Sequence, residues 1–159
     1  MKIETFGVEM WMNKWETKCA FNLAETCVES LRIEELLRLS GRNSDDLSAL
    51  LPLKMTYGDI KGSNRLRAAI SKLYVKQTVE NILITHGTIG ANMLVHKTII
   101  EPRDKVISIV PTYQQHYSIP ESIGADIKIM TLKEERGWLP DLNKLRDMSK
   151  DGVKLIALT

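Results

Sequence analysis

The sequence has few cysteines, few histidines and no long apolar run. Its 159 residues include two cysteines and three scattered histidines, so we expect neither a disulfide framework nor a metal site. Cys19 and Cys27 fit free thiols, which indicates a cytoplasmic protein. The absence of an apolar stretch of about 18 residues argues against a membrane span. The net charge, 22 − 20 = +2, is too small to indicate nucleic acid or an anionic membrane as a partner.

What is present is the composition of an ordinary soluble globular protein, with 43% hydrophobic and 26% charged residues. In the second half, short apolar runs alternate with stretches of helical periodicity. Predicted strands cover residues 82–85, 106–110, 127–132 and 154–159, and predicted helices cover 91–100, 113–122 and 142–148. Such alternation implies crossover connections and a mainly parallel sheet.

The first half has a weaker pattern. Residues 1–20 read as an arm or a short helix, and residues 31–39 as an amphipathic helix that ends near Gly41. A further helix is expected after the glycine loop at 57–62, with Ser63 or Asn64 as its cap. Its expected core stripe is Leu66, Ala69, Ile70, Leu73 and Tyr74.

The stretch from Ile82 to Gly90 raises a functional question, because an apolar run ends in His86-Gly-Thr-Ile-Gly90 and a helix follows. One interpretation is an ordinary turn from strand to helix, which a short glycine pattern alone favours. The other is an anion site, since amides at a helix N-terminus bind phosphate. The donors would then be the amides of Thr88 and Ile89 and the Thr88 hydroxyl, while Gly87 keeps side chains out of the way.

Five groups of motifs follow one another in a recognisable order. They are Tyr57-Gly-Asp-Ile-Lys-Gly62 with Leu66-Arg67, Thr85-His-Gly-Thr-Ile-Gly90, Pro102-Arg-Asp with Pro111-Thr-Tyr113, Gly124-Ala125 with Leu139-Pro-Asp-Leu142, and Leu155 to Thr159. In this order and spacing the chain resembles the class I and II aminotransferases, the fold-type I enzymes that use pyridoxal phosphate. Phe6 to Met12 and Thr112 to Ser122 resemble a branch close to capreomycidine synthase.

The resemblance implies an α/β fold, a three-layer α/β/α large domain with a mainly parallel sheet, here truncated at Thr159. Residues 1–50 would form an N-terminal arm and a small-domain segment, and residues 51–159 the first part of the large domain. The lysine that binds the cofactor in this family lies beyond Thr159, in a Ser-x-x-Lys context. We therefore expect no catalytic residue in this segment, and we expect the segment to be inactive alone.

The resemblance also implies pyridoxal 5'-phosphate as cofactor and assigns residues to it. Gly87, Thr88 and Ile89 would bind its phosphate, and the Tyr113 ring would stack on its pyridine. Tyr57 would reach the phosphate of the neighbouring subunit, which implies a homodimer. Ala24 lies where the family's N-terminal segment approaches the substrate. The structural alternatives are a half-buried tyrosine opening a helix at 113, a loop tyrosine over the core at 57, and a simple connecting strand at 24.

Other charged residues invite a functional interpretation that we do not follow. His86 lies at a variable position beside the glycine turn, and we expect His116 on a helix surface or behind the site. We likewise place Arg65 and Arg67 on a helix surface.

Three functions remain. The first is an N-terminal part of an aminotransferase acting on amino acids and 2-oxo acids. The second is a pyridoxal phosphate-dependent cyclase or lyase resembling capreomycidine synthase. The third is a non-catalytic short protein that binds a phosphate-bearing ligand or regulates a longer relative. Neither nucleic acid nor a membrane is an expected partner.

Overall fold

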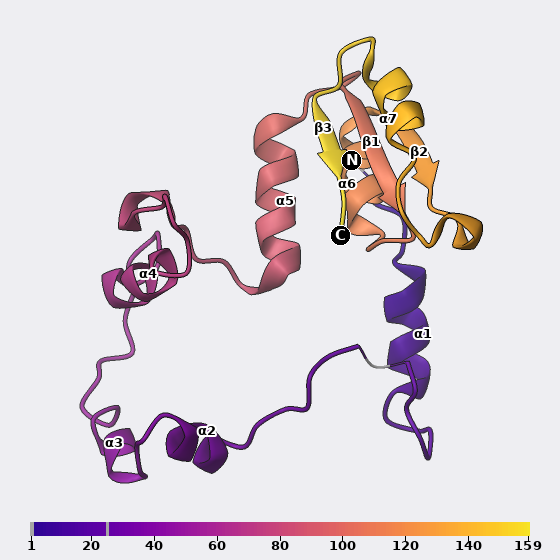
Figure 1. The fold of residues 1–159 in the computed structure, drawn as a ribbon. Coiled ribbons are helices and arrows are strands. Elements are labelled where there is room, and N and C mark those ends of the chain that lie inside the picture. The colour runs from indigo at the N-terminus through magenta and orange to yellow at the C-terminus, as the bar shows by residue number, and fades with distance from the viewer. Residues whose placement is uncertain (1, 25) are drawn as a thin grey trace. The chain divides into compact units, whose positions relative to one another are not determined.

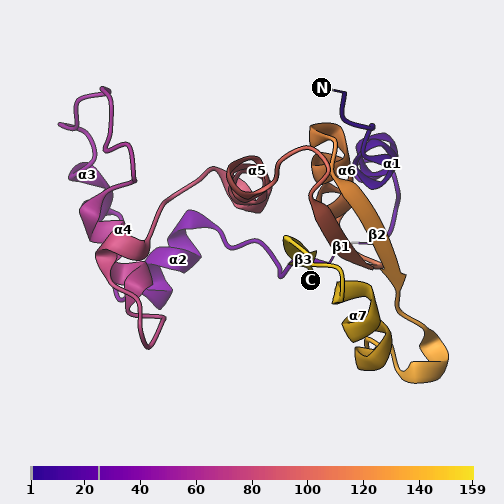
Figure 2. The same cartoon turned by 90° about the horizontal axis from the view of Figure 1, so that it is seen from above.

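The structure, a computed structural model, describes residues 2–24 and 26–159. The chain forms two compact units, which Figures 1 and 2 show in two views. One unit combines Met1–Lys14 with Ile84–Thr159, and the other comprises Trp15–Leu83. No helix among the described residues is long and apolar enough to cross a membrane.

The first unit contains a parallel sheet of three strands. They are β1 (Lys105–Val110), β2 (Asp126–Thr131) and β3 (Leu155–Ala157), in the order β2-β1-β3. Val106 of β1 lies opposite Ile127 of β2 and Leu155 of β3. Four of the six residues of the central strand β1 are buried, as expected of a parallel strand covered on both faces. The predicted parallel sheet is confirmed.

Helices cover both faces of this sheet. Helix α6 (Gln115–Ile123) lies on one face and α7 (Leu142–Ser149) on the other (Figure 2). Helix α5 (Gly87–Ile99) packs against α6. Beneath α7 lie the buried side chains of Ile107, Ile109 and Met130, packed against Leu132, Leu145, Met148 and Val153. The arrangement is the three-layer α/β/α sandwich that the sequence predicts.

The segment between β2 and α7 is held by Asp141. It begins with the 3-10 turn η2 (Glu134–Arg136), and the Arg136 guanidinium bonds to the Asp141 carboxylate. Asp141 also caps α7, because its Oδ1 accepts the amides of Asn143 and Lys144, both at 3.1 Å. The Lys144 amide, followed by the Arg136 side chain, holds the pKa of this carboxyl below its ordinary value.

The N-terminal arm forms a helix, α1 (Gly7–Trp15), in agreement with the expectation of a short helix. The second unit holds α2 (Ile33–Leu39), α3 (Asp45–Ser48), α4 (Asn64–Ser71) and the 3-10 turn η1 (Val79–Asn81). Helix α2 ends as predicted, with Gly41 in the left-handed region at φ +69°. Ser63 caps α4, since its Oγ accepts the Leu66 amide at 3.3 Å.

The predicted core stripe of α4 is wrong. Leu73 is 79% exposed and Tyr74 is 57% exposed, and the helix already ends at Ser71. Among the described residues of Trp15–Leu83, Arg67 alone is buried. The periodic apolar residues of α4 find no apolar surface within their own unit, so helical periodicity alone does not place them in a core.

The predicted strand at 82–85 is also wrong. These residues are extended but pair with no strand among the described residues, and an isolated segment cannot form a ladder. Helix α5 begins at Gly87, four residues before the predicted start at Ala91. The glycine turn therefore forms the first turn of the helix, and it is this turn that bears on function.

Candidate functional site

The turn that begins α5 depends on a glycine. Gly87 has φ +70°, in the left-handed region that side chains with a Cβ rarely adopt. Apart from its chain neighbours and the backbone of its own helix, no heavy atom of the described residues lies within 4 Å of the place where a Cβ would stand, so the backbone conformation, rather than crowding, requires glycine here. The Thr85 hydroxyl donates to the Gly87 carbonyl oxygen at 3.2 Å and closes the turn locally. The turn is thus held by its own residues.

The first turn of α5 is not capped by a side chain. His86 precedes the helix, and its side chain makes no capping hydrogen bond. The described first turn also carries no acidic residue, so the positive end of the helix dipole is not neutralised from within. The side chains of Thr88 and Ile89 are exposed. This geometry leaves backbone amides and one hydroxyl available to an external anion.

Tyr113 follows β1, beyond the cis peptide bond between Val110 and Pro111. It is 58% exposed, so the ring is accessible to a ligand. Next to it, the Thr112 hydroxyl lies 2.5 Å from the Thr159 hydroxyl, which joins the carboxyl ends of β1 and β3. In open α/β sheets ligands bind at this carboxyl edge.

The glycine turn and Tyr113 lie toward the same end of their unit. Helix α5 runs antiparallel to β1 and β3, so its first turn points toward the edge where these strands end (Figure 1). The first turn of α5, which contains Gly87, Thr88 and Ile89, therefore lies in the same unit as β1 and toward the end of that strand, which Tyr113 follows in the chain. Their role in binding a cofactor remains a prediction.

Tyr57 and Ala24 belong to the other unit. Tyr57 is fully exposed. It therefore does not cover a core within its own unit, as the alternative of a loop tyrosine over the core would require. The Ala24 amide donates to Asn22 Oδ1 at 3.0 Å, and the residue lies outside any strand. Neither role in binding is tested by these positions.

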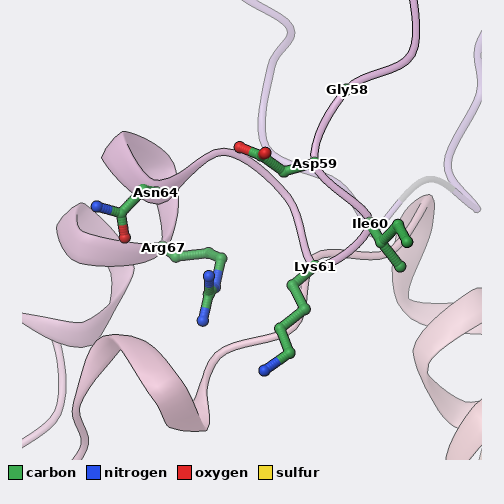
Figure 3. Close-up of a pocket in the computed structure, with 6 residues that line it drawn as sticks. All are labelled: Gly58, Asp59, Ile60, Lys61, Asn64 and Arg67. Atoms are coloured by element: carbon green, nitrogen blue, oxygen red, sulfur yellow. The ribbon is translucent and has the colours of Figure 1, made fainter.

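A shallow pocket of about 520 Å³ lies beside the glycine loop, and its lining begins at Gly58, the residue after Tyr57 (Figure 3). Its lining residues come from the glycine loop and from α4, namely Gly58, Asp59, Ile60, Lys61, Asn64 and Arg67. The side chains of Lys61 and Arg67 point to the same side of the loop. Both cationic groups lie near the Glu80 carboxylate, at 3.6 Å and 3.8 Å, so this pocket carries its own counter-charge.

Arg67 is a structural residue that the sequence analysis placed wrongly on the helix surface. Its Nη2 donates to the Val79 carbonyl at 2.6 Å, and its Nε donates to the Ile82 carbonyl at 2.9 Å. The guanidinium thereby satisfies two carbonyls around η1 and ties that turn to α4. The available signal in the sequence was its position in the Leu66-Arg67 pair, one of the motifs of the family resemblance.

Two histidines meet between α5 and α6. The rings of His96 and His116 are 6.0 Å apart at their centroids and cross at 82°. His96 is buried and His116 is half-buried, and both Nδ1 atoms lack a hydrogen-bond partner among the described residues. Burial lowers the pKa of both imidazoles, and the neighbouring His116 lowers the pKa of His96 further. His116 is thus not a surface residue, and sequence analysis missed its partner.

We expect acidification to weaken the packing of α5 on α6. The pKa values of both imidazoles in the folded protein lie below the ordinary value of 6.5. At pH values just below 6.5 the unfolded chain therefore binds more protons than the folded protein does. The free energy of unfolding is therefore highest above pH 6.5 and falls as the pH drops through it. Thermal unfolding at about pH 7.5 and about pH 5.5 measures this difference.

The matched variants are His116→Gln and His86→Gln. The first removes a half-buried imidazole and relieves His96 of its like-charged neighbour, so it should flatten the pH dependence. The second changes an exposed histidine and should leave it unchanged. Equal slopes in wild type and His116→Gln would contradict the assignment.

Comparison with known proteins supplies the family. The family model described as aminotransferase class I and II matches residues 52–159. A crystal structure of a PLP-dependent aminotransferase from Streptococcus suis is 45% identical and superposes with a TM-score of 0.93. An alanine aminotransferase from Pyrococcus furiosus is 26% identical, with a TM-score of 0.61 over 65% of this chain and 28% of that chain.

A second similar protein is a curated synthase. The capreomycidine synthase of Streptomyces vinaceus is 29% identical over 101 residues, which is 64% of this chain. The chain spans only part of these relatives, namely 26% of the synthase and 42% of the Streptococcus protein, although 98% of the chain is matched in the latter.

Proposed function

Because the chain belongs to the aminotransferase class I and II family, we propose that it supplies the phosphate-binding and ring-stacking residues of a pyridoxal phosphate-dependent aminotransferase. Such an enzyme transfers amino groups between amino acids and 2-oxo acids. The observation that carries the proposal is the uncapped first turn of α5, which begins at a left-handed Gly87. The 45% identity to the PLP-dependent aminotransferase of Streptococcus suis supports it.

The residues present fit a phosphate group. The turn offers the amides of Thr88 and Ile89, it carries no acidic side chain, and the space beside Gly87 is open. The Thr88 hydroxyl is exposed and can donate a further hydrogen bond. In this proposal the turn binds the phosphate and fixes the position of the cofactor relative to the strand ends.

Tyr113 orients the ring of the cofactor. Its side chain is accessible at the carboxyl edge, where an aromatic face can hold a flat heterocycle at low entropic cost. When bound, pyridoxal phosphate acts as an electron sink that stabilises carbanions at the amino-acid substrate. The turn at Gly87 and Tyr113 then bind the cofactor and orient its ring.

The remaining assignments extend the same proposal. Tyr57 contacts the cofactor phosphate of a neighbouring subunit in a homodimer, for which its full exposure is a requirement. Ala24 lies in the N-terminal segment that approaches the substrate. The division into residues 1–50 and 51–159 and the cytoplasmic location also stay predictions.

A second candidate is a pyridoxal phosphate-dependent cyclase or lyase. The observation that favours it is the 29% identity to capreomycidine synthase. The same phosphate turn and ring support serve both chemistries, because the cofactor supplies the electron sink in each. The residues that choose between them need not lie in this chain.

Analysis of the reaction products of the protein expressed from the complete reading frame tests the proposal. With pyridoxal phosphate, an amino acid and a 2-oxo acid, we expect one new amino acid and one new 2-oxo acid in equal amounts. Consumption of an amino acid without a new 2-oxo acid would favour the cyclase or lyase. Binding of pyridoxal phosphate without turnover of any amino acid would favour the non-catalytic alternative.

A further inference from the structure

The side chain of Gln114 joins two segments that are far apart in the sequence. Its Nε2 donates to the Thr5 carbonyl oxygen at 3.1 Å, and its Oε1 accepts the Gly7 amide at 3.0 Å. These bonds span 109 and 107 residues, and they lie within one unit. One amide side chain therefore fastens the N-terminal arm to the segment that follows β1.

The bond to Gly7 meets a need of helix α1. Gly7 is its first residue, and the first amides of a helix have no partner within the helix. The preceding residue is Phe6, whose side chain has no acceptor to offer. Its carbonyl accepts the Met10 amide at 3.0 Å, which is the first bond of the helix. Gln114 thus acts as the cap that α1 lacks locally.

The same residue begins another helix. The Gln114 carbonyl accepts the amides of Tyr117 at 3.1 Å and Ser118 at 2.9 Å, in the first turn of α6. Gln114 also follows Tyr113 directly in the chain. Its backbone is therefore fixed by α6 and its side chain by α1, and Tyr113 lies next to this junction.

We propose that Gln114 is a positioning residue that couples helix α1 to the ring of Tyr113. This inference rests on the proposed function, in which Tyr113 supports the cofactor. While Gln114 holds both helices, the backbone that carries Tyr113 has few alternative conformations, and the ring is ready for the cofactor before it binds. Release of α1 loosens this backbone and weakens cofactor binding from a distance.

Gly7 allows a test that leaves the cofactor residues untouched. Gly7→Pro removes the one amide hydrogen that Gln114 accepts, and proline is tolerated at the first position of a helix. Gly7→Ala is the matched control, because it keeps the amide and its Cβ would meet no described residue within 4 Å beyond its own neighbours in the chain. Gln114→Ala removes both hydrogen bonds.

Two measurements are made on the protein expressed from its complete reading frame. Hydrogen exchange at the Met10 amide reports on α1, and titration with pyridoxal phosphate reports on Tyr113. We expect Gly7→Pro and Gln114→Ala to speed the exchange. Gly7→Pro should weaken cofactor affinity about fivefold, as for one net hydrogen bond, and Gln114→Ala, which removes two, should weaken it at least as much. Gly7→Ala should do neither. In the Gln114→Ala background, Gly7→Pro should have no further effect on affinity.

The outcomes separate the inference from the proposed function. Faster exchange with unchanged affinity would overturn the positioning role, and unchanged exchange would overturn the coupling itself. A wild-type protein that binds no pyridoxal phosphate would overturn the proposed function and the cofactor role of Gln114 together. The exchange data would then still report whether α1 is fastened by Gln114.

Discussion

Replacing Arg67 with alanine should make the amides of α4 and of η1 exchange their hydrogens about 100-fold faster. The guanidinium donates to two carbonyls, and hydrogen bonds from a charged group contribute about 1.5–3 kcal/mol each. A loss of about 3 kcal/mol corresponds to roughly two decades in a local opening equilibrium. Native-state hydrogen exchange at Ile82, whose amide donates to the Val79 carbonyl, measures the effect directly.

The matched control lies on the same helix. Arg65 is exposed, so Arg65→Ala removes the same kind of side chain without breaking the bonds to the Val79 and Ile82 carbonyls and should leave exchange nearly unchanged. Arg67→Lys should fall between wild type and Arg67→Ala, because a single ammonium group does not reproduce the two directed bonds. Equal exchange rates in Arg67→Ala and Arg65→Ala would show that the two hydrogen bonds of Arg67 contribute nothing to local stability.

Replacing Gly87 with valine should weaken the binding of pyridoxal phosphate by about 10- to 100-fold. A β-branched residue disfavours the left-handed conformation that Gly87 adopts, and such strain costs about 1–3 kcal/mol. Relief of the strain would rotate the following peptide groups and turn the amides of Thr88 and Ile89 away from the phosphate. Titration with the cofactor, followed by its absorbance, gives the affinity.

Gly90→Ala is the control for this variant. A Cβ at Gly90 would meet the Thr85 Cβ at 3.7 Å, an ordinary contact, and the residue lies inside α5, where alanine is favourable. Circular dichroism checks that both variants keep their helices. If Gly87→Val bound the cofactor as tightly as Gly90→Ala does, the turn would not be the phosphate site.

Patterns in the sequence predict those parts of the fold that depend on residues close together in the chain. The apolar run at 106–110 marks the central strand, and the stretch of helical periodicity at 142–148 marks α7. The glycine turn is recognisable because left-handed backbone and an exposed helix N-terminus need particular residues. These features depend on neighbours within a few residues.

The features that sequence analysis missed depend on distant partners. The segment predicted as a strand at 82–85 has the right residues but pairs with no strand in the part of the chain that the structure describes, and a strand requires a partner. Arg67 is buried because carbonyls 12 and 15 residues away need donors. Gln114 meets the N-terminal arm across more than 100 residues, and His96 meets His116 from another helix. No periodicity along the chain encodes such pairs.

The burial pattern of Trp15–Leu83 has a thermodynamic consequence. Because Arg67 is the buried residue among those described in this unit, its unfolding would expose little additional apolar surface. Newly hydrated apolar area is what raises the heat capacity on denaturation. Taken by itself, this unit should contribute almost no heat-capacity increment, and its free energy should vary nearly linearly with temperature. The sheet-bearing unit, which buries Ile107, Ile109 and Met130, would carry the curvature of the stability curve.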